Sequence, residues 1–300
     1  MYTVKKFLSL IGVRSVSGNI DTAIESLNLC NRKTQFNAIL SYATSDKYMQ
    51  SCMENRAVKA MIVPVDCTCY EAILNERNGA VIYSETPEKD FYVLHEALCR
   101  CGDFYEKYDF PSEFGVGCDI HPSTVIYDGV KIGNYVKIGA NTVVKPGTII
   151  EDCVTIGCNS VIGSEGFQLI TIKDEMPMHI THVGGVHICS HVYIGDCSCV
   201  GNTLFEGATY IGKGAKIDNL VHIAHNLYIG ENAVITAHST LCGSSVVADG
   251  AWLAPQTAVL NNVVIGKNAM TGLSSVVLRS ISDNMLAYGF PAEEKRNRNV

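Results

Sequence analysis

Residues 217–241, IDNLVHIAHNLYIGENAVITAHSTL, place a large aliphatic residue at every sixth position: Ile217, Ile223, Ile229, Ile235 and Leu241. A period of six fits neither an amphipathic helix, which repeats every ~3.6 residues, nor an alternating strand, which repeats every ~2. It fits a parallel β-helix, in which short strands form the three faces of a prism and the aliphatic side chains point inward. Glycine follows several of these residues and eases the turn at each corner.

The same spacing extends in both directions from this stretch. It begins at Ile120, breaks between residues 164 and 187, resumes at Ile188, shifts by one residue at Phe205 and then runs to Val277. Three six-residue steps make one coil of about 18 residues, and coils stack at the usual strand spacing of about 4.8 Å. We therefore expect a mostly β protein, with a β-helix over residues 120–280 and an excursion at 164–187.

The sequence before the repeat has a different character. Residues 1–102 combine helix-like stretches (VKKFLSLI, DKYMQSCMENR, FYVLHEALCRC) with short apolar strands (KAMIVPV, GAVIYS). This mixture predicts a separate α/β domain. Residues 103–119 are interpreted as a linker, and residues 281–300 as a segment that closes the last coil.

Composition excludes several classes of protein. A net charge of −7 argues against nucleic acid as the main partner. No apolar run approaches the roughly 20 residues of a membrane span, and the N-terminus lacks the apolar region and cleavage site of a signal peptide. The 13 cysteines include C-x-C pairs at 67–69, 99–101 and 197–199 without a matching half-site for zinc. We expect reduced, small core cysteines, no bound metal and a cytoplasmic location.

His225 stands out at a corner of the predicted prism. Stacking of 18-residue coils would place Gly207 below His225 and Gly243 above it, which leaves space beside the imidazole. The backbone N–H of Gly243 would face that space. An imidazole next to an N–H donor suits acyl transfer, with the ring as general base and the N–H as oxyanion donor. The alternative is that His225 is an ordinary solvent-facing corner residue.

Three motifs resemble the UDP-3-O-acylglucosamine N-acyltransferases of lipid A synthesis. IDNLVHIAHNLYIG at 217–230 is close to that family's I-D-N-x-V-x-I-A-H-N-x-x-I-G, and GSEGF at 163–167 resembles G-[SA]-D-G-F. LSYATSDKYMQ at 40–50 looks like L-S-F-L-x-N-P-K-Y. The resemblance implies a left-handed β-helix, a uridine-binding N-terminal domain, and a homotrimer whose sites lie between neighbouring prisms.

The resemblance also implies roles for individual residues. His225 would be the general base and Gly243 the oxyanion donor, while Tyr42 and Tyr48 would stack on uracil. The other substrate-binding candidates are Ser45, Asp218, His222, Asn226 and Asn262, of which Ser45 and Asn262 replace a family asparagine and histidine. The implied reaction moves an acyl group from a carrier thioester, acyl carrier protein or coenzyme A, to the amine of a nucleotide-linked amino sugar. No cofactor would be bound permanently.

Differences between this sequence and the family's motifs leave other functions open. SCVGNTLFEG lacks a family arginine, the C-terminal helices that help dock acyl carrier protein are not predicted, and YGFPAEEK resembles the close of acetyl-CoA-dependent hexapeptide acetyltransferases. One alternative is therefore an acetyl-CoA-dependent nucleotide-amino-sugar N-acetyltransferase of surface polysaccharide synthesis. Another is an inactive sugar-nucleotide-binding scaffold. The last is a γ-type carbonic anhydrase, whose zinc would draw on His187, His191, His222 and His225.

Overall fold

The chain forms two compact units in the computed structural model, which describes residues 2–12, 15–32, 34–67, 73, 76–171 and 176–297. The N-terminal unit comprises residues 1–106 and 168–181, and the β-helix comprises residues 107–167 and 182–300. The first boundary lies beyond the expected residue 102. The excursion is divided between the two units, because its tip belongs to the N-terminal unit and its two ends belong to the β-helix.

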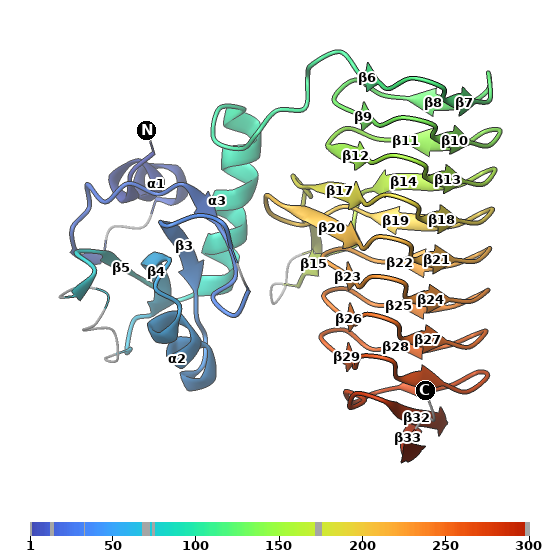
Figure 1. The fold of residues 1–300 in the computed structure, drawn as a ribbon. Helices are drawn as coiled ribbons and strands as arrows, with labels where there is room; N and C mark the ends of the chain where they lie inside the picture. Colours follow the sequence, from blue (N-terminus) through green and yellow to red (C-terminus); the bar gives the residue numbers. More distant parts are fainter. Residues whose placement is uncertain are drawn as a thin grey trace. The chain divides into compact units, whose positions relative to one another are not determined.

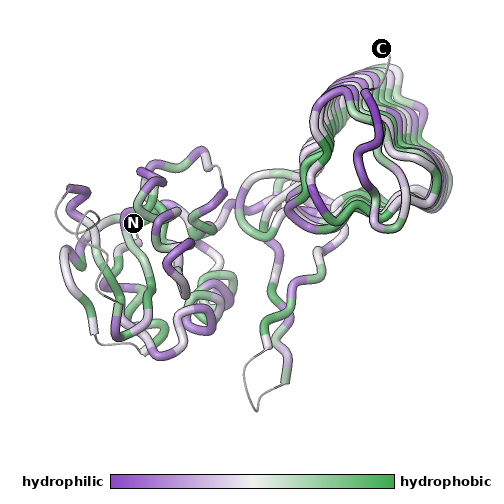
Figure 2. The backbone as a smooth tube through the Cα atoms, turned by 90° about the horizontal axis from the view of Figure 1, so that it is seen from below, coloured by the Kyte–Doolittle hydropathy of each residue, from purple (hydrophilic) through white to green (hydrophobic). Residues whose placement is uncertain are grey.

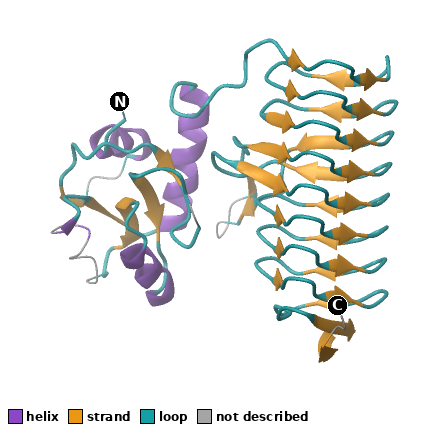
Figure 3. Cartoon of the chain, viewed as in Figure 1, coloured by secondary structure: helices purple, strands orange, loops and turns teal. Residues whose placement is uncertain are grey.

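The N-terminal unit is an α/β module with helices α1 (Val4–Ile11), α2 (Asp46–Glu54) and α3 (Pro87–Cys101), which coincide with the expected helical stretches (Figure 1). Its sheet has the order β1-β5-β4-β3-β2, with β1 antiparallel and the other strands parallel. The strands are β1 (Val16–Gly18), β2 (Ser26–Leu27), β3 (Ile39–Tyr42), β4 (Val58–Pro64) and β5 (Ala80–Ser84). Figure 3 shows these helices and strands by type.

Helix α3 has local features that fix both of its ends. Pro87 occupies the first turn, where its missing N–H costs nothing, and Glu88 and Asp90 in that turn suit the positive end of the helix dipole. Gly102 ends the helix in the left-handed conformation, with φ of 70°. Arg100 lies in the last turn, where a cation is favourable.

The tip of the excursion is a short hairpin of β15 (Leu169–Ile170) and β16 (Met178–His179). Thr181, which follows it, is held by α3. Its N–H donates to Glu96 Oε1 at 2.7 Å, and its carbonyl oxygen lies 2.8 Å from His95 Nε2. Burial lowers the pKa of His95, so the ring stays neutral in this contact.

The β-helix consists of three parallel sheets, which we call faces 1, 2 and 3 in the order in which the chain visits them. Face 1 contains β6 (Glu113–Phe114), β9 (Lys131–Ile132), β12 (Thr148–Ile150), β17 (Gly185–Ile188), β20 (Ala208–Ile211), β23 (Tyr228–Ile229), β26 (Val246–Val247) and β29 (Val264–Ile265). Face 2 contains β7 (Asp119–Ile120), β10 (Lys137–Ile138), β13 (Thr155–Ile156), β18 (Tyr193–Ile194), β21 (Lys216–Ile217), β24 (Val234–Ile235), β27 (Trp252–Leu253), β30 (Met270–Thr271) and the hairpin β32 (Met285–Gly289) and β33 (Ala292–Asn297). Face 3 contains β8 (Val125–Ile126), β11 (Val143–Val144), β14 (Val161–Ser164), β19 (Cys199–Gly201), β22 (His222–Ile223), β25 (Thr240–Leu241), β28 (Ala258–Val259) and β31 (Val276–Val277).

The interior of the prism is built from the residues that the six-residue spacing singles out. Ile217, Ile223, Ile229, Ile235 and Leu241 are all fully buried, and they belong to one continuous hydrophobic core. Seen along the axis in Figure 2, the coils superimpose as a rounded triangle. The periodicity thus predicted both the architecture and the inward-facing residues.

The first strand of the β-helix is β6, so the repeat starts before residue 120 and the expected linker at 103–119 is too long. Phe114 in β6 stands six residues before Ile120 and obeys the same spacing. It is 54% exposed because no earlier coil covers it. Phe114 therefore differs from the buried inward residues of later coils because it lies at the end of the prism.

The coil before His225 is longer than the repeat predicts. Cys199 pairs with His222 and Val200 with Ile223, which makes this coil 23 residues long rather than 18. The five extra residues lie in the corner segment 202–207 and include the buried Phe205. Gly207 is therefore not the residue below His225, and Asn202 occupies the equivalent place, 23 residues earlier.

The described cysteines differ in exposure, and five of them are of intermediate exposure. Cys30, Cys52, Cys67 and Cys189 are buried, as expected for small core residues, whereas Cys101, Cys153 and Cys197 are exposed. Cys153 and Cys197 have φ of 59° and 56° and occupy turn positions that asparagine takes in other coils, such as Asn141 and Asn159. The expectation of core cysteines is wrong for these three; Cys69 lies outside the described residues. In the part of the chain that the structure describes, no helix combines the length and hydropathy needed to cross a bilayer.

Candidate active site

The corner between face 3 and face 1 collects the irregular segments of the β-helix. The excursion leaves after β14 and returns at β17, the extra residues of the 23-residue coil lie between β19 and β20, and His225 lies between β22 and β23. All three segments lie at the same corner in successive coils, and the first two of them interrupt the regular repeat. The fold therefore gathers residues far apart in sequence beside His225.

His225 lies directly against Gly243 of the next coil, as the predicted stacking requires. A Cβ atom added at Gly243 would come within 2.6 Å of both Nε2 and Cε1 of the His225 ring. No real side chain tolerates such an approach, so glycine at this position makes room for the imidazole. The Ser244 N–H donates to the His225 carbonyl oxygen at 3.0 Å and ties the two coils together.

The hydrogen bonds around Asn226 fix the proton of the His225 ring. Asn226 Oδ1 accepts the backbone N–H of Leu204 at 3.2 Å, which identifies that atom as the amide oxygen. The same oxygen lies 2.9 Å from His225 Nδ1, so Nδ1 must be the protonated nitrogen that donates to it. The lone pair of the neutral ring is then on Nε2, the nitrogen that faces Gly243. This is the tautomer that a general base needs.

The N–H of Gly243 is also distinctive. At other corners, the backbone N–H of the second residue after the inward aliphatic residue donates to an aspartate of the next coil. The Asn134 N–H donates in this way to Asp152 at 2.7 Å, and the Glu231 N–H donates to Asp249 at 3.1 Å. Among the hydrogen bonds between described residues, none uses the N–H of Gly243. This N–H, which has no acceptor among the described residues, belongs to the glycine that faces Nε2.

Three further residues of the β-helix complete the surroundings of His225, and their proximity to it was not predicted from the sequence. His182 is only 7% exposed, and its ring lies edge-to-face with that of His225, with centroids 5.2 Å apart. A Cβ atom at Gly166 would come within 2.9 Å of His225 Cβ. Asn202 joins the two ends of the excursion, because its Oδ1 accepts the Gly166 N–H and its Nδ2 donates to the His182 carbonyl oxygen, both at 3.3 Å. Only GSEGF gave a sequence indication of this arrangement.

The other candidates of the β-helix are not all gathered here. Asn226 contacts His225, and the Asn262 N–H donates to the Gly243 carbonyl oxygen at 3.3 Å, so both lie at the same corner. Asp218 follows β21 at the corner between faces 2 and 3, where its Oδ2 accepts the Ala237 N–H at 3.2 Å. His222 projects from face 3, and burial lowers its pKa. The structure assigns Asp218 a corner-stabilising contact and does not bring it to His225.

Tyr42, Ser45 and Tyr48 belong to the N-terminal unit. Tyr42 Oη donates to Glu88 Oε1 at 2.9 Å, and its ring packs on Phe91 with centroids 4.9 Å apart. Tyr48 on α2 is 42% exposed, and Ser45 is the exposed residue before that helix. A cavity of about 620 Å³ in this unit is lined by none of the three; its lining residues are Cys30, Asn31, Arg32, Thr34, Ser51, Glu54, Asn55 and Ala57.

Comparison with known proteins shows which group of enzymes this chain resembles. Residues 117–146, 129–164 and 208–243 match the family model for the bacterial transferase hexapeptide. A UDP-3-O-acylglucosamine N-acyltransferase of Campylobacter lari is 35% identical over 131 residues, which are 44% of this chain and 41% of the relative. Another, of Wolinella succinogenes, is 31% identical over 179 residues, 60% of this chain and 50% of the relative. The match thus spans half or less of these relatives, and the predicted resemblance to this group is confirmed over that span.

A solved structure shares the fold. The UDP-N-acetylglucosamine acyltransferase from Campylobacter jejuni superposes with a TM-score of 0.50 at 23% identity, covering 62% of this chain and 70% of that chain. This likeness, together with the repeat match, confirms the predicted left-handed parallel β-helix.

Proposed function

We propose that this relative of the UDP-3-O-acylglucosamine N-acyltransferases is itself an N-acyltransferase acting on a nucleotide-linked amino sugar. The observation that carries the proposal is the pairing of His225 Nε2 with the uncapped N–H of Gly243 at one corner. A base and an oxyanion donor in contact with the same space are what acyl transfer requires. The relatives' names supply the class of acceptor.

In the proposed reaction, the amine nitrogen of the sugar attacks the carbonyl carbon of an acyl thioester. His225 Nε2 takes a proton from the attacking nitrogen, and the Gly243 N–H donates to the oxygen on which negative charge develops. The carbon–sulfur bond then breaks, the carrier thiol leaves with a proton, and an amide remains. Through its bond to Nδ1, Asn226 fixes the tautomer of the neutral ring in which the lone pair is on Nε2.

The donor is an acyl carrier protein or coenzyme A thioester. An assay that combines two donors with two groups of acceptors distinguishes these two possibilities. Purified protein is incubated with 3-hydroxyacyl carrier protein or acetyl-CoA, each against UDP-3-O-acylglucosamine and a panel of UDP- and dTDP-amino sugars. Mass spectrometry identifies the product. A long hydroxyacyl chain on UDP-3-O-acylglucosamine supports the lipid A reaction, and a short acyl group on another amino sugar supports the surface-polysaccharide alternative. No product with any pair argues for the inactive scaffold.

The carbonic anhydrase alternative finds no support in the geometry. His187 projects from face 1, His191 lies in the turn between faces 1 and 2, and His222 projects from face 3. His225 lies at the corner between faces 3 and 1. A single chain therefore does not gather three of these histidines around one ion, and this alternative requires zinc ligands from a neighbouring subunit. A stoichiometric zinc content in the purified protein, held by three of these histidines, would favour it over acyl transfer.

We also propose a homotrimer that packs through face 3. The outward residues of this face are uncharged and mostly β-branched: Val125, Val143, Val161, Cys199, His222, Thr240, Ala258 and Val276. Face 2, by contrast, carries Lys137 and Lys216 at equivalent outward positions. Face 3 adjoins the His225 corner, so a neighbouring prism there would help to enclose the site.

Introducing a charge on face 3 tests the trimer. Val161→Lys should convert the trimer to monomers in light scattering coupled to gel filtration, because each interface would bury an unpaired ammonium group. Thr155→Lys on face 2 is the matched control and should remain trimeric. A trimer that survives Val161→Lys, or that dissociates equally with Thr155→Lys, contradicts the assignment of face 3.

The N-terminal unit offers a separate test of nucleotide binding. Tyr48→Ala should raise KM for the nucleotide sugar about tenfold and leave kcat nearly unchanged, because a stacking contact worth ~1–3 kcal/mol is lost on binding alone. Tyr48 is exposed, so the change should not unfold the unit. Gln50→Ala on the same helix is the control. Equal KM values for Tyr48→Ala, Gln50→Ala and the wild type would remove Tyr48 from the nucleotide site.

A further inference from the structure

At the corner between faces 1 and 2, two coils depart from the residue pattern that most other coils share. The residue after the inward aliphatic at this corner is small in most coils: Gly133, Gly212, Gly230, Ala248 and Gly266. Added Cβ atoms at Gly212 and Gly230 would lie 2.7 Å and 2.5 Å from backbone nitrogens of the next coil, which explains the preference for glycine. In two successive coils, however, the position is taken by Glu151 and Cys189.

These two exceptions lie next to a third side chain that can bind a metal. β12 pairs with β17 so that Ile150 lies beside Ile188, and Glu151 and Cys189 follow them directly. His187 projects outward from β17, and its Nε2 lies 2.9 Å from Glu151 Oε1. One ligand atom from each of Glu151, His187 and Cys189 falls within 4.8 Å of the other two.

Neighbouring groups orient these side chains. Glu151 Oε2 accepts the N–H of Ser190 at 2.9 Å and its hydroxyl at 2.7 Å, which turns Oε1 toward His187. The Tyr210 hydroxyl lies 3.1 Å from Cys189 Sγ, and the Tyr210 ring stands edge-to-face with His187 at 5.5 Å. Supporting hydrogen bonds of this kind hold metal ligands in place in proteins.

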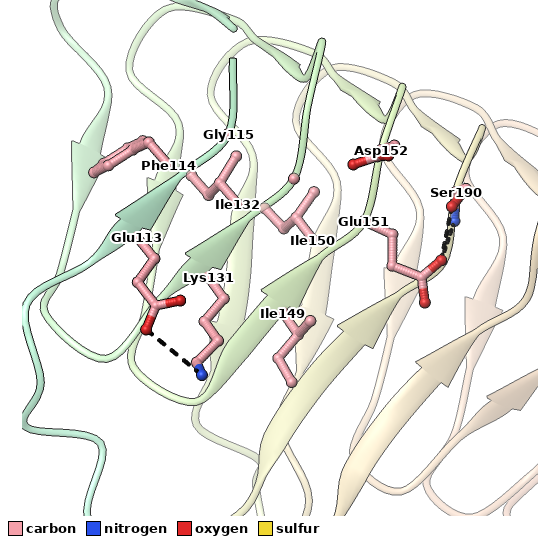
Figure 4. Close-up of a pocket in the computed structure, with 11 residues that line it drawn as sticks. Glu113, Phe114, Gly115, Lys131, Ile132, Ile149, Ile150, Glu151, Asp152 and Ser190 are labelled. Carbon is pink, nitrogen blue, oxygen red and sulfur yellow. Dashed lines mark hydrogen bonds and ion pairs between the residues drawn. The ribbon is translucent and has the colours of Figure 1, made fainter.

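Glu151 lines one end of a pocket of about 520 Å³ on face 1, whereas His187 and Cys189 are not among its lining residues. Figure 4 shows Glu151 and Ser190 at one end of this pocket and the Lys131–Glu113 ion pair at the other. Cys189 is 6% exposed, whereas the side chains of His187 and Glu151 are 33% and 39% exposed. An ion could thus reach the two part-exposed side chains from solvent, with the buried sulfur within 4.8 Å of their ligand atoms.

We propose that Glu151, His187 and Cys189 form a binding site for a divalent ion of the zinc class, distinct from the His225 corner. Nitrogen, sulfur and carboxylate oxygen are the ligand types that zinc combines, at about 2.0–2.3 Å. Such bonds place tetrahedral ligands roughly 3.4–3.8 Å apart, so small rotations of the two part-exposed side chains close the site. Three protein ligands leave one position for water. This proposal departs from our expectation, based on sequence, of a protein without metal.

Cobalt(II) is the probe for this site, because thiolate ligation gives it a charge-transfer absorption that oxygen and nitrogen ligands do not. The full chain, stripped of metal with a chelator, should bind one Co²⁺ per chain with that band, and added Zn²⁺ should abolish the band. Cys189→Ala should remove the band, and His187→Ala should weaken Co²⁺ binding more than about 100-fold, since even supporting residues cost 10–100-fold. Alanine is tolerated in this corner column, where Ala248 already stands.

Cys153→Ala is the matched control, because Cys153 is an exposed thiol two residues after Glu151 that is not one of the three proposed ligands, and it should leave the band unchanged. Melting temperatures of all variants establish that they are folded. Failure of the wild type to show a thiolate band, or a band that persists in Cys189→Ala, overturns the proposal. The readout does not involve acyl transfer, so it is independent of the proposed activity.

Discussion

Replacing His225 by alanine should lower kcat by about 10²–10⁴-fold, with KM for the nucleotide sugar changed only a few-fold. A general base accelerates the reaction by this factor because it stabilises the transition state, and it contributes little to the binding of the substrate in the ground state. Nε2 is the basic nitrogen because Nδ1 donates to Asn226 Oδ1, so alanine removes the only proton acceptor that faces Gly243 within this network. Steady-state kinetics with the preferred donor and acceptor measure the effect.

His238→Asn is the control for that experiment. His238 is an exposed histidine at the corner between faces 2 and 3, with φ of 61°, and asparagine occupies the same conformation at Asn232 and Asn268. This variant should keep wild-type kinetics. A loss of less than tenfold in His225→Ala, or an equal loss in His238→Asn, would mean that His225 is not the base.

Gly243→Ala should also lower kcat by at least about 100-fold. The added methyl group would overlap Nε2 and Cε1 of His225, since its carbon would lie 2.6 Å from both. The ring must then move by a large fraction of an ångström, and a displacement of about 1 Å can cost 100-fold in rate. The same methyl group fills the space into which the N–H donates, which weakens oxyanion stabilisation.

Cys242→Ala, one residue earlier, separates this effect from general damage to the corner. Its side chain is part-exposed, and its removal creates no overlap with His225. Cys242→Ala should retain wild-type turnover and both variants should keep the wild-type circular dichroism spectrum. Near-normal turnover in Gly243→Ala would show that the space beside Nε2 is not where the reaction occurs.

The periodicity of the sequence predicted most of the fold, because each inward position of the prism demands an aliphatic residue. It could not predict the length of the coil before His225. Phe205 is buried although it lies outside any strand, so it imitates an inward residue of the repeat. A hydrophobic pattern alone does not distinguish a one-residue shift from the observed five-residue insertion at a corner.

The candidate site was predicted where it depends on local stacking and missed where it depends on the excursion. Gly243 follows His225 by one regular coil, and the structure places it where the spacing put it. His182 reaches the same corner only because the chain leaves the prism after β14 and returns before β17. The metal-binding cluster had a visible sequence indication, since Glu151 and Cys189 replace the small residues usual at their corner.

The most direct test of the central claim is to determine which atom of the acceptor carries the transferred acyl group. The product of the preferred donor and amino sugar is treated with mild alkali and analysed by tandem mass spectrometry, since an ester is cleaved and an amide survives. We predict that the transferred acyl group survives alkali as an amide, even where an ester already on the acceptor is cleaved, and that the wild type forms this product and His225→Ala does not. Removal of the transferred acyl group by alkali, which would place it on oxygen, or product formation undiminished in His225→Ala, would contradict the account.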